Sequence, residues 1–241
     1  MTIDRFQTEA DLSAALAARV LETIVTRPRT VLGLPTGRTP LGLYRELRER
    51  SGGDRIDWSQ VRTFNLDEFA GLGPAHPASY FSFMQAELFE HVSLVPEHIG
   101  FLNGTAPDLV AECRQYDDAI ARAGGIDLQI LGIGANGHIG FNEPADGLCA
   151  ETHVAVLTQP TREANAHRFD HDWTQVPERA LSMGMATILG AREIILIATG
   201  QEKAAAVQGM IEGLITTRLP ASLLQVHPSV TVMVDREAWP R

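Results

Sequence analysis

Short apolar runs alternate along this chain with longer segments whose apolar residues recur at helical spacing. The short runs predict buried strands, and the longer segments predict amphipathic helices. Strands are expected at 29–34, 61–66, 99–102, 126–132, 153–157, 193–199 and 230–234. Helices are expected at 11–26, 39–50, 78–91, 107–123, 179–189 and 202–212. Such alternation is typical of a mainly parallel sheet with helices on its faces.

The rest of the sequence adds little that would divide this sheet into parts. The chain has 241 residues and shows no internal repeat, low-complexity tract or linker rich in proline and serine. Single α/β domains reach this length. We therefore expect one domain over 1–241.

Composition excludes several classes of protein. Hydrophobic residues make up 44% of the chain, but no apolar run is long enough for a membrane helix, and the first residues lack a signal-peptide pattern. Cys113 and Cys149 fit neither a disulfide framework nor a zinc site. A net charge of −10 argues against nucleic-acid binding. We expect a cytoplasmic protein without membrane or nucleic-acid partners, in which any anionic substrate is met by local basic groups.

The segment 129–144 carries the strongest chemical signal. Its apolar strand runs into a turn with Gly132, Gly134 and Gly137, and the turn then presents His138 and Glu143. Ligands of α/β proteins bind where strands end in this way. A carboxylate beside an imidazole fixes its tautomer and raises its basicity. The segment therefore predicts a proton-transfer pair, His138 with Glu143.

The same glycines formally match the dinucleotide fingerprint G-x-G-x-x-G. That fingerprint requires a helix directly after the glycines and an acidic residue about 20 positions further on. Here Phe141 and Pro144 follow, and the segment 154–158 is apolar. We therefore reject a dinucleotide site.

The turn after the first expected strand is a candidate anion site. It consists of Pro35, Thr36, Gly37, Arg38 and Thr39, and a helix follows it. Small residues allow close approach of the backbone, and the amides at a helix start attract anions. The alternative is an ordinary turn in which Thr39 caps the helix.

Two further strand ends carry charged residues. Asp67 and Glu68 follow the second expected strand, where a carboxylate can act as a general base. Acidic residues after strands are also common as solvated turn residues, and that alternative stays open. Lys203 follows a buried strand and is either a point charge for a phosphate or a surface lysine.

Several separated segments together resemble glucosamine-6-phosphate deaminases, also called isomerases. The matching segments are Leu-Gly-Leu-Pro-Thr-Gly at 32–37, Phe-Asn-Leu-Asp-Glu-Phe at 64–69, Gly-His-Ile-Gly-Phe-Asn-Glu-Pro at 137–144, Gly-Gln-Glu-Lys-Ala at 200–204 and Pro-Ala-Ser-Leu-Leu-Gln-Val-His at 220–227. They stand in the family's order and span nearly the whole chain. The resemblance implies a doubly wound, Rossmann-like parallel sheet with the site at the carboxyl ends of its strands.

The resemblance also assigns roles. The aspartate at position 67 takes the proton from sugar C2, and Glu68 supports it. His138 opens the pyranose ring with help from Glu143 and from Asn136, a position that is aspartate in some members. Residues 35–39, Gly137 and Lys203 hold the sugar and its 6-phosphate. The implied reaction converts glucosamine 6-phosphate and water into fructose 6-phosphate and ammonia, without a metal or organic cofactor. His227 receives no chemical role.

One motif departs from the family pattern Thr-Arg-x-Ala-Asn-x-Arg, whose second arginine reaches the substrate phosphate. This chain has His167 at that position, and Arg168 follows one residue later. A shift of one residue turns a helical side chain by roughly 100°. We favour Arg168 as the phosphate ligand, with His167 as the alternative.

Two regional expectations follow from the same resemblance. The stretch 145–175 is rich in glycine, aspartate and proline, so we expect irregular structure there and a lid over the sugar. Long hexameric members have an allosteric pocket for N-acetylglucosamine 6-phosphate lined by basic residues. The matching stretch 151–156 contains no lysine or arginine, so we expect no such activation. The oligomeric state is left open.

Three alternative functions stay open. One is deamination of another amino-sugar phosphate, such as galactosamine 6-phosphate. Another is 6-phosphogluconolactonase, whose signature continues differently after the histidine. The third is a sugar-phosphate sensor without catalysis. Asp67, His138 and Glu143 together argue against a sensor, because binding alone needs no base at C2.

Overall fold

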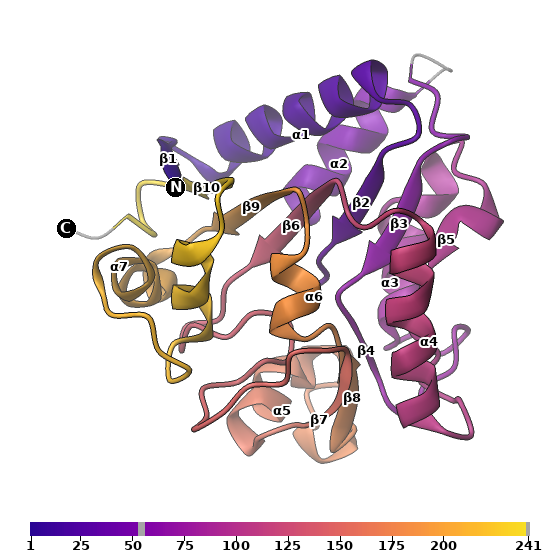
Figure 1. Cartoon of the computed structure of the whole chain (residues 1–241), viewed down its shortest axis with the longest axis vertical. Coiled ribbons are helices and arrows are strands. Elements are labelled where there is room, and N and C mark those ends of the chain that lie inside the picture. The colour runs from indigo at the N-terminus through magenta and orange to yellow at the C-terminus, as the bar shows by residue number, and fades with distance from the viewer. Residues whose placement is uncertain (53–55, 240–241) are drawn as a thin grey trace.

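The computed structural model describes residues 1–52 and 56–239, and Figure 1 shows the arrangement. A parallel sheet of seven strands, in the order β1-β10-β9-β6-β2-β3-β5, forms its centre. The strands are β1 (Thr2–Arg5), β2 (Val31–Leu34), β3 (Arg62–Asn65), β5 (Ile99–Gly100), β6 (Leu128–Gly132), β9 (Glu193–Ala198) and β10 (Val230–Val234). The doubly wound, mostly parallel fold expected from the sequence is confirmed.

Helices cover both faces of this sheet, as the alternation of apolar runs predicts. The helices are α1 (Glu9–Thr26), α2 (Leu41–Ser51), α3 (Tyr80–Glu87), α4 (Leu109–Arg122), α5 (Gln159–Asn165), α6 (Met185–Leu189) and α7 (Ala204–Glu212). One apolar core joins α1, α2 and α3 to one face, and a second joins α4, α6 and α7 to the other. Along β9, Ile194 and Leu196 enter one core while Ile195 and Ile197 enter the other. Both faces of the strand are therefore buried, as in parallel sheets generally.

The strand order changes direction between β2 and β6. From β2 the chain proceeds outward through β3 to β5, whereas from β6 it proceeds the other way through β9 to β10. The turns that follow β2 and β6 therefore diverge, and such divergence is expected to open a crevice at the carboxyl ends of these strands. This is the position at which doubly wound sheets bind ligands.

A small antiparallel sheet extends the molecule beyond this crevice. It consists of β4 (Asp67–Phe69), β8 (Arg179–Ser182) and β7 (His153–Val156), in that order. With α5 it forms the lower part of Figure 1. A third apolar cluster, which includes Phe69, Phe141 and Phe169, fills its interior.

Several expected elements differ from the structure. The helix expected over 179–189 is wrong in its first half, because residues 179–182 form β8 and pair with both β4 and β7. Gly184 precedes α6, and a Cβ there would lie 2.1 Å from the Glu151 carbonyl oxygen. Irregular structure over 145–175 is also wrong in part, since that stretch contains β7, α5 and the 3-10 turns η3 (Ala166–Arg168) and η4 (Trp173–Gln175). The sequence pattern missed β1 and β4.

Three 3-10 turns connect other elements. They are η1 (Phe89–His91), η2 (Pro96–His98) and η6 (Pro220–Val226), and a further turn, η5 (Gln201–Lys203), precedes α7. Within the described residues, no helix is both long enough and apolar enough to cross a membrane.

Candidate active site

The turns that follow β2, β3 and β6 meet around the carboxylate of Asp67. Thr36, in the turn after β2, donates a hydrogen bond of 3.4 Å from its hydroxyl to Oδ1 of Asp67. Gly140, in the loop after β6, lies on the other side, and a Cβ there would be 3.6 Å from Oδ2. Three of the motifs found in the sequence are thus brought to one point.

Asp67 is nearly buried, with 7% of its surface exposed. Burial, together with the nearby charge of Glu68, raises its pKa to about 7, although the hydrogen bond from Thr36 opposes both. A carboxylate that titrates near neutral pH can accept a proton and return it, which suits a general base. The solvated-turn alternative for Asp67 is wrong.

Glu68 accepts hydrogen bonds from backbone N–H groups at the start of a helix. Its Oε1 accepts from the backbone N–H groups of Phe69 (2.8 Å) and Tyr80 (3.0 Å), and its Oε2 accepts from that of Phe81 (2.9 Å). The side chain is 2% exposed, so it is no solvated turn residue either. Burial raises the pKa of Glu68, while these N–H groups and Arg168 lower it. Glu68 thereby fixes the start of α3 beside Asp67, which fits the supporting role expected from the sequence.

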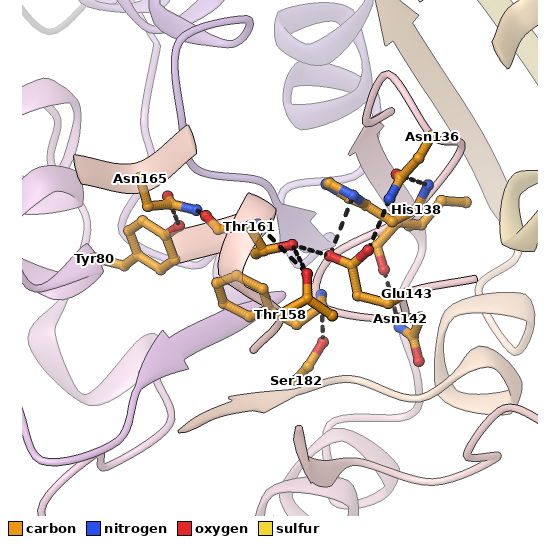
Figure 2. Close-up of polar contacts among 11 residues, drawn as sticks. Tyr80, Asn136, His138, Asn142, Glu143, Thr158, Thr161, Asn165 and Ser182 are labelled. Carbon is orange, nitrogen blue, oxygen red and sulfur yellow. Dashed lines mark hydrogen bonds and ion pairs between the residues drawn. The ribbon is translucent and has the colours of Figure 1, made fainter. Parts of the chain in front are cut away.

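His138 and Glu143 lie together in the loop after β6 (Figure 2). Imidazole Nδ1 is 3.4 Å from Oε1 of Glu143. Burial raises the pKa of Glu143, but His138, the hydroxyl of Thr161 and the amide of Asn136 outweigh it and lower the pKa to about 2. Glu143 therefore stays ionised at neutral pH and faces the imidazole as a negative charge.

Asn136 forms hydrogen bonds with both members of this pair. Its Nδ2 donates to Oε2 of Glu143 at 2.8 Å, and its Oδ1 accepts from the backbone N–H of His138 at 3.2 Å. The side chain thus contacts the carboxylate and the loop backbone. It orients the imidazole through Glu143.

The glycines of this loop make room for the histidine. A Cβ on Gly134 would lie 2.3 Å from Cε1 of His138, so only glycine leaves space for the ring. Gly137 has a φ of +83°, which closes the turn, and its N–H donates to the Gly134 carbonyl at 2.9 Å. The glycine spacing that imitated a dinucleotide fingerprint is therefore explained by the position of His138.

The turn 35–39 follows β2 directly, with Pro35 buried and Arg38 exposed. Gly37 has a φ of +95°, and the Tyr44 hydroxyl donates to the carbonyl of Pro35. Pro40 is the residue before α2, and no side chain caps this helix. The alternative in which Thr39 caps the helix is therefore wrong. The N-terminus of α2 keeps its attraction for an anion.

Lys203 and Arg38 bring positive charge to the same edge. Lys203 lies in η5 after β9, half-buried, whereas Arg38 is exposed. Burial lowers the pKa of the Lys203 ammonium, the charge of Arg38 lowers it further, and Glu202 opposes both. Two cations that repel each other gain from a shared anion, which favours the phosphate interpretation of Lys203.

Arg168 faces the interior, and His167 faces solvent. After Asn165 the α5 helix tightens into η3, so the shifted arginine does not follow α-helical spacing. Its Nε donates to the carbonyl of Ala78 (3.2 Å) and its Nη2 to that of Ser79 (3.0 Å). Burial lowers the pKa of Arg168, and the negative charge of Glu68 raises it. Of the two candidates, Arg168 lies on the side of Asp67 and Glu68.

Sequence reasoning missed the polar side chains that tie this site together. Ser182 accepts from the backbone N–H of Phe141 at 3.0 Å, and Thr161 donates to Glu143 at 2.6 Å. Both come from elements distant in sequence, and no motif spacing points to these contacts. His227, in contrast, is structural, since its Nε2 donates to the Ala191 carbonyl at 2.8 Å and its Nδ1 accepts from the Ser229 N–H.

A separate hollow of about 1000 Å³ lies at the start of α4, beside Ala70, Val154 and Arg179. None of the expected site residues lines it. The candidate site is therefore defined by convergent side chains at the strand ends.

Several known proteins are similar to this chain over nearly its whole length. The chain is 48% identical, over 95% of its length and 90% of the relative, to a glucosamine-6-phosphate deaminase of Thermoanaerobacter pseudethanolicus. It is 50% identical to glucosamine-6-phosphate deaminase 2 of Bacillus subtilis, over 95% of this chain and 92% of the relative. The structure of a monomeric glucosamine-6-phosphate deaminase superposes with a TM-score of 0.95 at 43% identity, covering 99% of this chain and 98% of that one.

Lactonases share the fold at lower similarity. A 6-phosphogluconolactonase from Trypanosoma cruzi superposes with a TM-score of 0.78 at 20% identity, over 98% of this chain and 95% of that chain. Residues 4–233 match the family of glucosamine-6-phosphate isomerases and 6-phosphogluconolactonases. The protein therefore belongs to the glucosamine-6-phosphate isomerase/6-phosphogluconolactonase family.

Proposed function

We propose that this protein converts glucosamine 6-phosphate and water into fructose 6-phosphate and ammonia. The observation that carries the proposal is the pair of proton-transfer sites on one crevice, Asp67 with its pKa near 7 and His138 with ionised Glu143. An aldose-to-ketose conversion that begins from a closed ring needs both of these sites. The deaminase relatives support the same activity.

Ring opening is the task of His138. The imidazole takes the proton from O1 of the sugar and delivers a proton to O5, so that the C1–O5 bond breaks. Glu143 holds the ring of His138 at Nδ1 and stabilises the imidazolium that forms. Asn136 holds the second carboxylate oxygen of Glu143.

Isomerisation is the task of Asp67. Its carboxylate takes the proton from C2, the electron pair forms a double bond between C1 and C2, and the C1=O π electrons move to O1, which takes a proton from the C2 ammonium group. The proton held by Asp67 then returns to C1 while the nitrogen lone pair forms the C2=N bond. The C2 centre is then an imine, to which water adds before ammonia leaves. These steps consume one water and require no oxidant or reductant.

The phosphate of the substrate is held by the turn 35–39 with Arg38, Lys203 and Arg168. Local charge is essential because the protein as a whole carries a net charge of −10. The start of α2 adds backbone amides and the helix dipole. Glu68 and Gly137 hold the neighbouring backbone in place.

The segment 145–175 serves as a lid. It contains α5 and η3, and so it carries both Arg168 and the contact from Thr161 to Glu143. Closure of this segment over the sugar excludes water until the imine has formed.

The two cysteines are consistent with a location in the reducing cytoplasm. Cys113 is buried and Cys149 is exposed, both as free thiols. Reducing compartments keep such thiols free. Sugar-phosphate substrates are the small-molecule partners that the site accommodates.

Ammonia release and fructose 6-phosphate formation from glucosamine 6-phosphate test the proposal. Galactosamine 6-phosphate and 6-phosphogluconolactone serve as parallel substrates. We expect ammonia and fructose 6-phosphate in equal amounts from the first substrate. Hydrolysis of the lactone without ammonia release would favour a lactonase instead. No activity on any of the three substrates would favour a sensor.

A further inference from the structure

The hydroxyl of Thr161 reaches from the lid to the catalytic glutamate (Figure 2). It donates a hydrogen bond of 2.6 Å to Oε1 of Glu143, the same oxygen that lies 3.4 Å from Nδ1 of His138. Thr161 is 6% exposed, so the bond is sheltered from water. A charge-assisted bond in such a place is stronger than one between neutral groups.

The direction of this bond follows from the groups around it. An ionised carboxylate can only accept hydrogen bonds, so Thr161 donates its single hydroxyl proton to Glu143. The 3.0 Å contact between the hydroxyls of Thr161 and Thr158 is then donated by Thr158. Thr158 also accepts from the backbone N–H of Thr161 at 3.4 Å, as the residue that caps α5. Because Thr158 is the donor in its contact with Thr161, the Thr161 hydroxyl proton is free to bind Glu143.

A second set of contacts holds α5 to the other half of the site. The amide of Asn165 donates to the Thr161 carbonyl at 2.9 Å and accepts from the Tyr80 hydroxyl at 3.1 Å. Tyr80 is the first residue of α3, and its backbone N–H donates to Glu68. Side chains therefore link the surroundings of Asp67 with those of His138 by way of α5, as Figure 2 shows in part.

We propose that Thr161 is a positioning residue for ring opening, which holds Oε1 of Glu143 toward His138 and makes the geometry of that pair depend on the position of the lid. The proposal rests on the function proposed above. Thr161 lies in α5 and Arg168 in η3, which follows α5 directly in the chain. A lid drawn in through Arg168 by the substrate phosphate therefore aligns the His138–Glu143 pair in the same movement.

Replacement of the hydroxyl by a methyl group tests this role. Thr161→Val keeps the shape of the side chain, and we expect kcat to fall by about tenfold or more while KM stays within about twofold. Thr161→Ser keeps the hydroxyl and restores kcat to within about threefold of wild type. Thr187→Val is the matched control, because Thr187 also donates to a carboxylate, that of Asp117, outside the site.

A second background shows whether Thr161 acts through Glu143. In Glu143→Ala the acceptor is gone, so adding Thr161→Val lowers kcat by no more than about twofold. An equal loss of kcat in both backgrounds would overturn the proposal, as would a Thr161→Val enzyme with wild-type kcat or a Thr161→Ser enzyme without rescue. Wild-type turnover in the same assay separates the two proposals: a wild type without ammonia release contradicts the proposed function itself.

Discussion

Two carboxylates of the site titrate on opposite sides of their ordinary range. Asp67 lies in a pocket where burial raises its pKa to about 7. Burial also acts on Glu143, but hydrogen bonds and the charge of His138 reverse it and lower the pKa to about 2. Environments that separate the pKa values of two carboxylates in this way give the two groups different roles in acid–base catalysis. In the proposed mechanism Asp67 therefore exchanges protons, whereas Glu143 remains a fixed negative charge.

Replacement of Asp67 by Asn removes the base and keeps nearly the same shape. We expect kcat to fall by about 10²- to 10⁴-fold, the range that general bases contribute. The affinity for glucosamine 6-phosphate stays within about threefold in isothermal titration, because the phosphate ligands are untouched. A variant that keeps more than about a tenth of wild-type turnover would show that another residue takes the C2 proton.

The raised pKa of Asp67 also makes stability depend on pH. Its folded value of about 7 lies above the ordinary 3.8, so the folded state binds this proton more tightly. The resulting stabilisation is complete below about pH 3.8 and is lost as the pH rises to about 7. Asp67→Asn resembles the protonated form at every pH. Its melting temperature relative to wild type should therefore rise between pH 4.5 and pH 8.

The acid limb of the activity profile reports the same group. We expect kcat/KM of the wild type to fall as the pH drops through about 7, since Asp67 must be ionised to act. A melting-temperature difference between Asp67→Asn and wild type that does not change with pH would contradict this assignment.

The sequence was sufficient for residues that stand in local motifs and insufficient for those that meet across the fold. Asp67, His138 and Glu143 follow strands and lie in short recognisable segments. Thr161 lies 18 residues from Glu143, and no periodicity links the two. Its contact exists because α5 packs beside the loop after β6 in the folded chain. Only the tertiary structure contains that information.

At the scale of elements, turns position the chemistry. Gly137 combines a φ of +83° with a close neighbour, since a Cβ there would lie 2.2 Å from Cδ1 of Leu219. Its carbonyl also accepts from the N–H of Ala221 at 3.0 Å, which ties the loop of His138 to η6. Backbone strain in this turn therefore moves the histidine directly.

Gly137→Ala should lower both stability and activity. The left-handed backbone costs about 1 to 2 kcal/mol with any side chain, which lowers the melting temperature by a few degrees. We expect kcat to fall by about tenfold, because His138 follows directly in the turn. Gly125→Ala is the control, since Gly125 has a φ of +84° with no atom within 4 Å of an added Cβ. It should lose the stability that the left-handed backbone alone costs, without the contact at Leu219, and it should keep wild-type kcat. An equal loss of kcat in both variants would contradict the argument.

The errors in the expected elements have identifiable causes. The helix over 179–189 was expected from apolar spacing. In the structure, however, the backbone of 179–182 pairs with β4 on one side and with β7 on the other. Strand β4 was missed because its three residues, Asp67–Phe69, include two carboxylates and carry no apolar alternation. Strand β1 is only four residues long and is stabilised by pairing with β10. Each is a tertiary effect that overrides local preference.

At the scale of the molecule, the order of the strands creates the site. Alternating strands and helices predicted a parallel sheet, but not which strands would be neighbours. The order that places β2 beside β6 brings the turn 35–39 and the loop of His138 to one crevice. The family resemblance implied a doubly wound sheet with the site at the carboxyl ends of its strands, but it gave no strand order. Hydrophobic periodicity does not give the order either, because β2, β6 and β9 are all mostly apolar and buried.

We expect the protein to show no allosteric activation by a second ligand. In the long hexameric members, basic residues bind N-acetylglucosamine 6-phosphate, whereas residues 151–156 here contain no lysine or arginine. These residues lead into and form β7, the edge strand of the small sheet, and that edge offers a phosphate no side-chain cation of its own. We therefore expect hyperbolic initial rates in glucosamine 6-phosphate and the same curve with millimolar N-acetylglucosamine 6-phosphate added. A sigmoidal curve that becomes hyperbolic with that ligand would contradict this and would locate a regulatory anion site outside 151–156. Simple competitive inhibition would leave the argument intact, because the active site itself recognises a 6-phosphate.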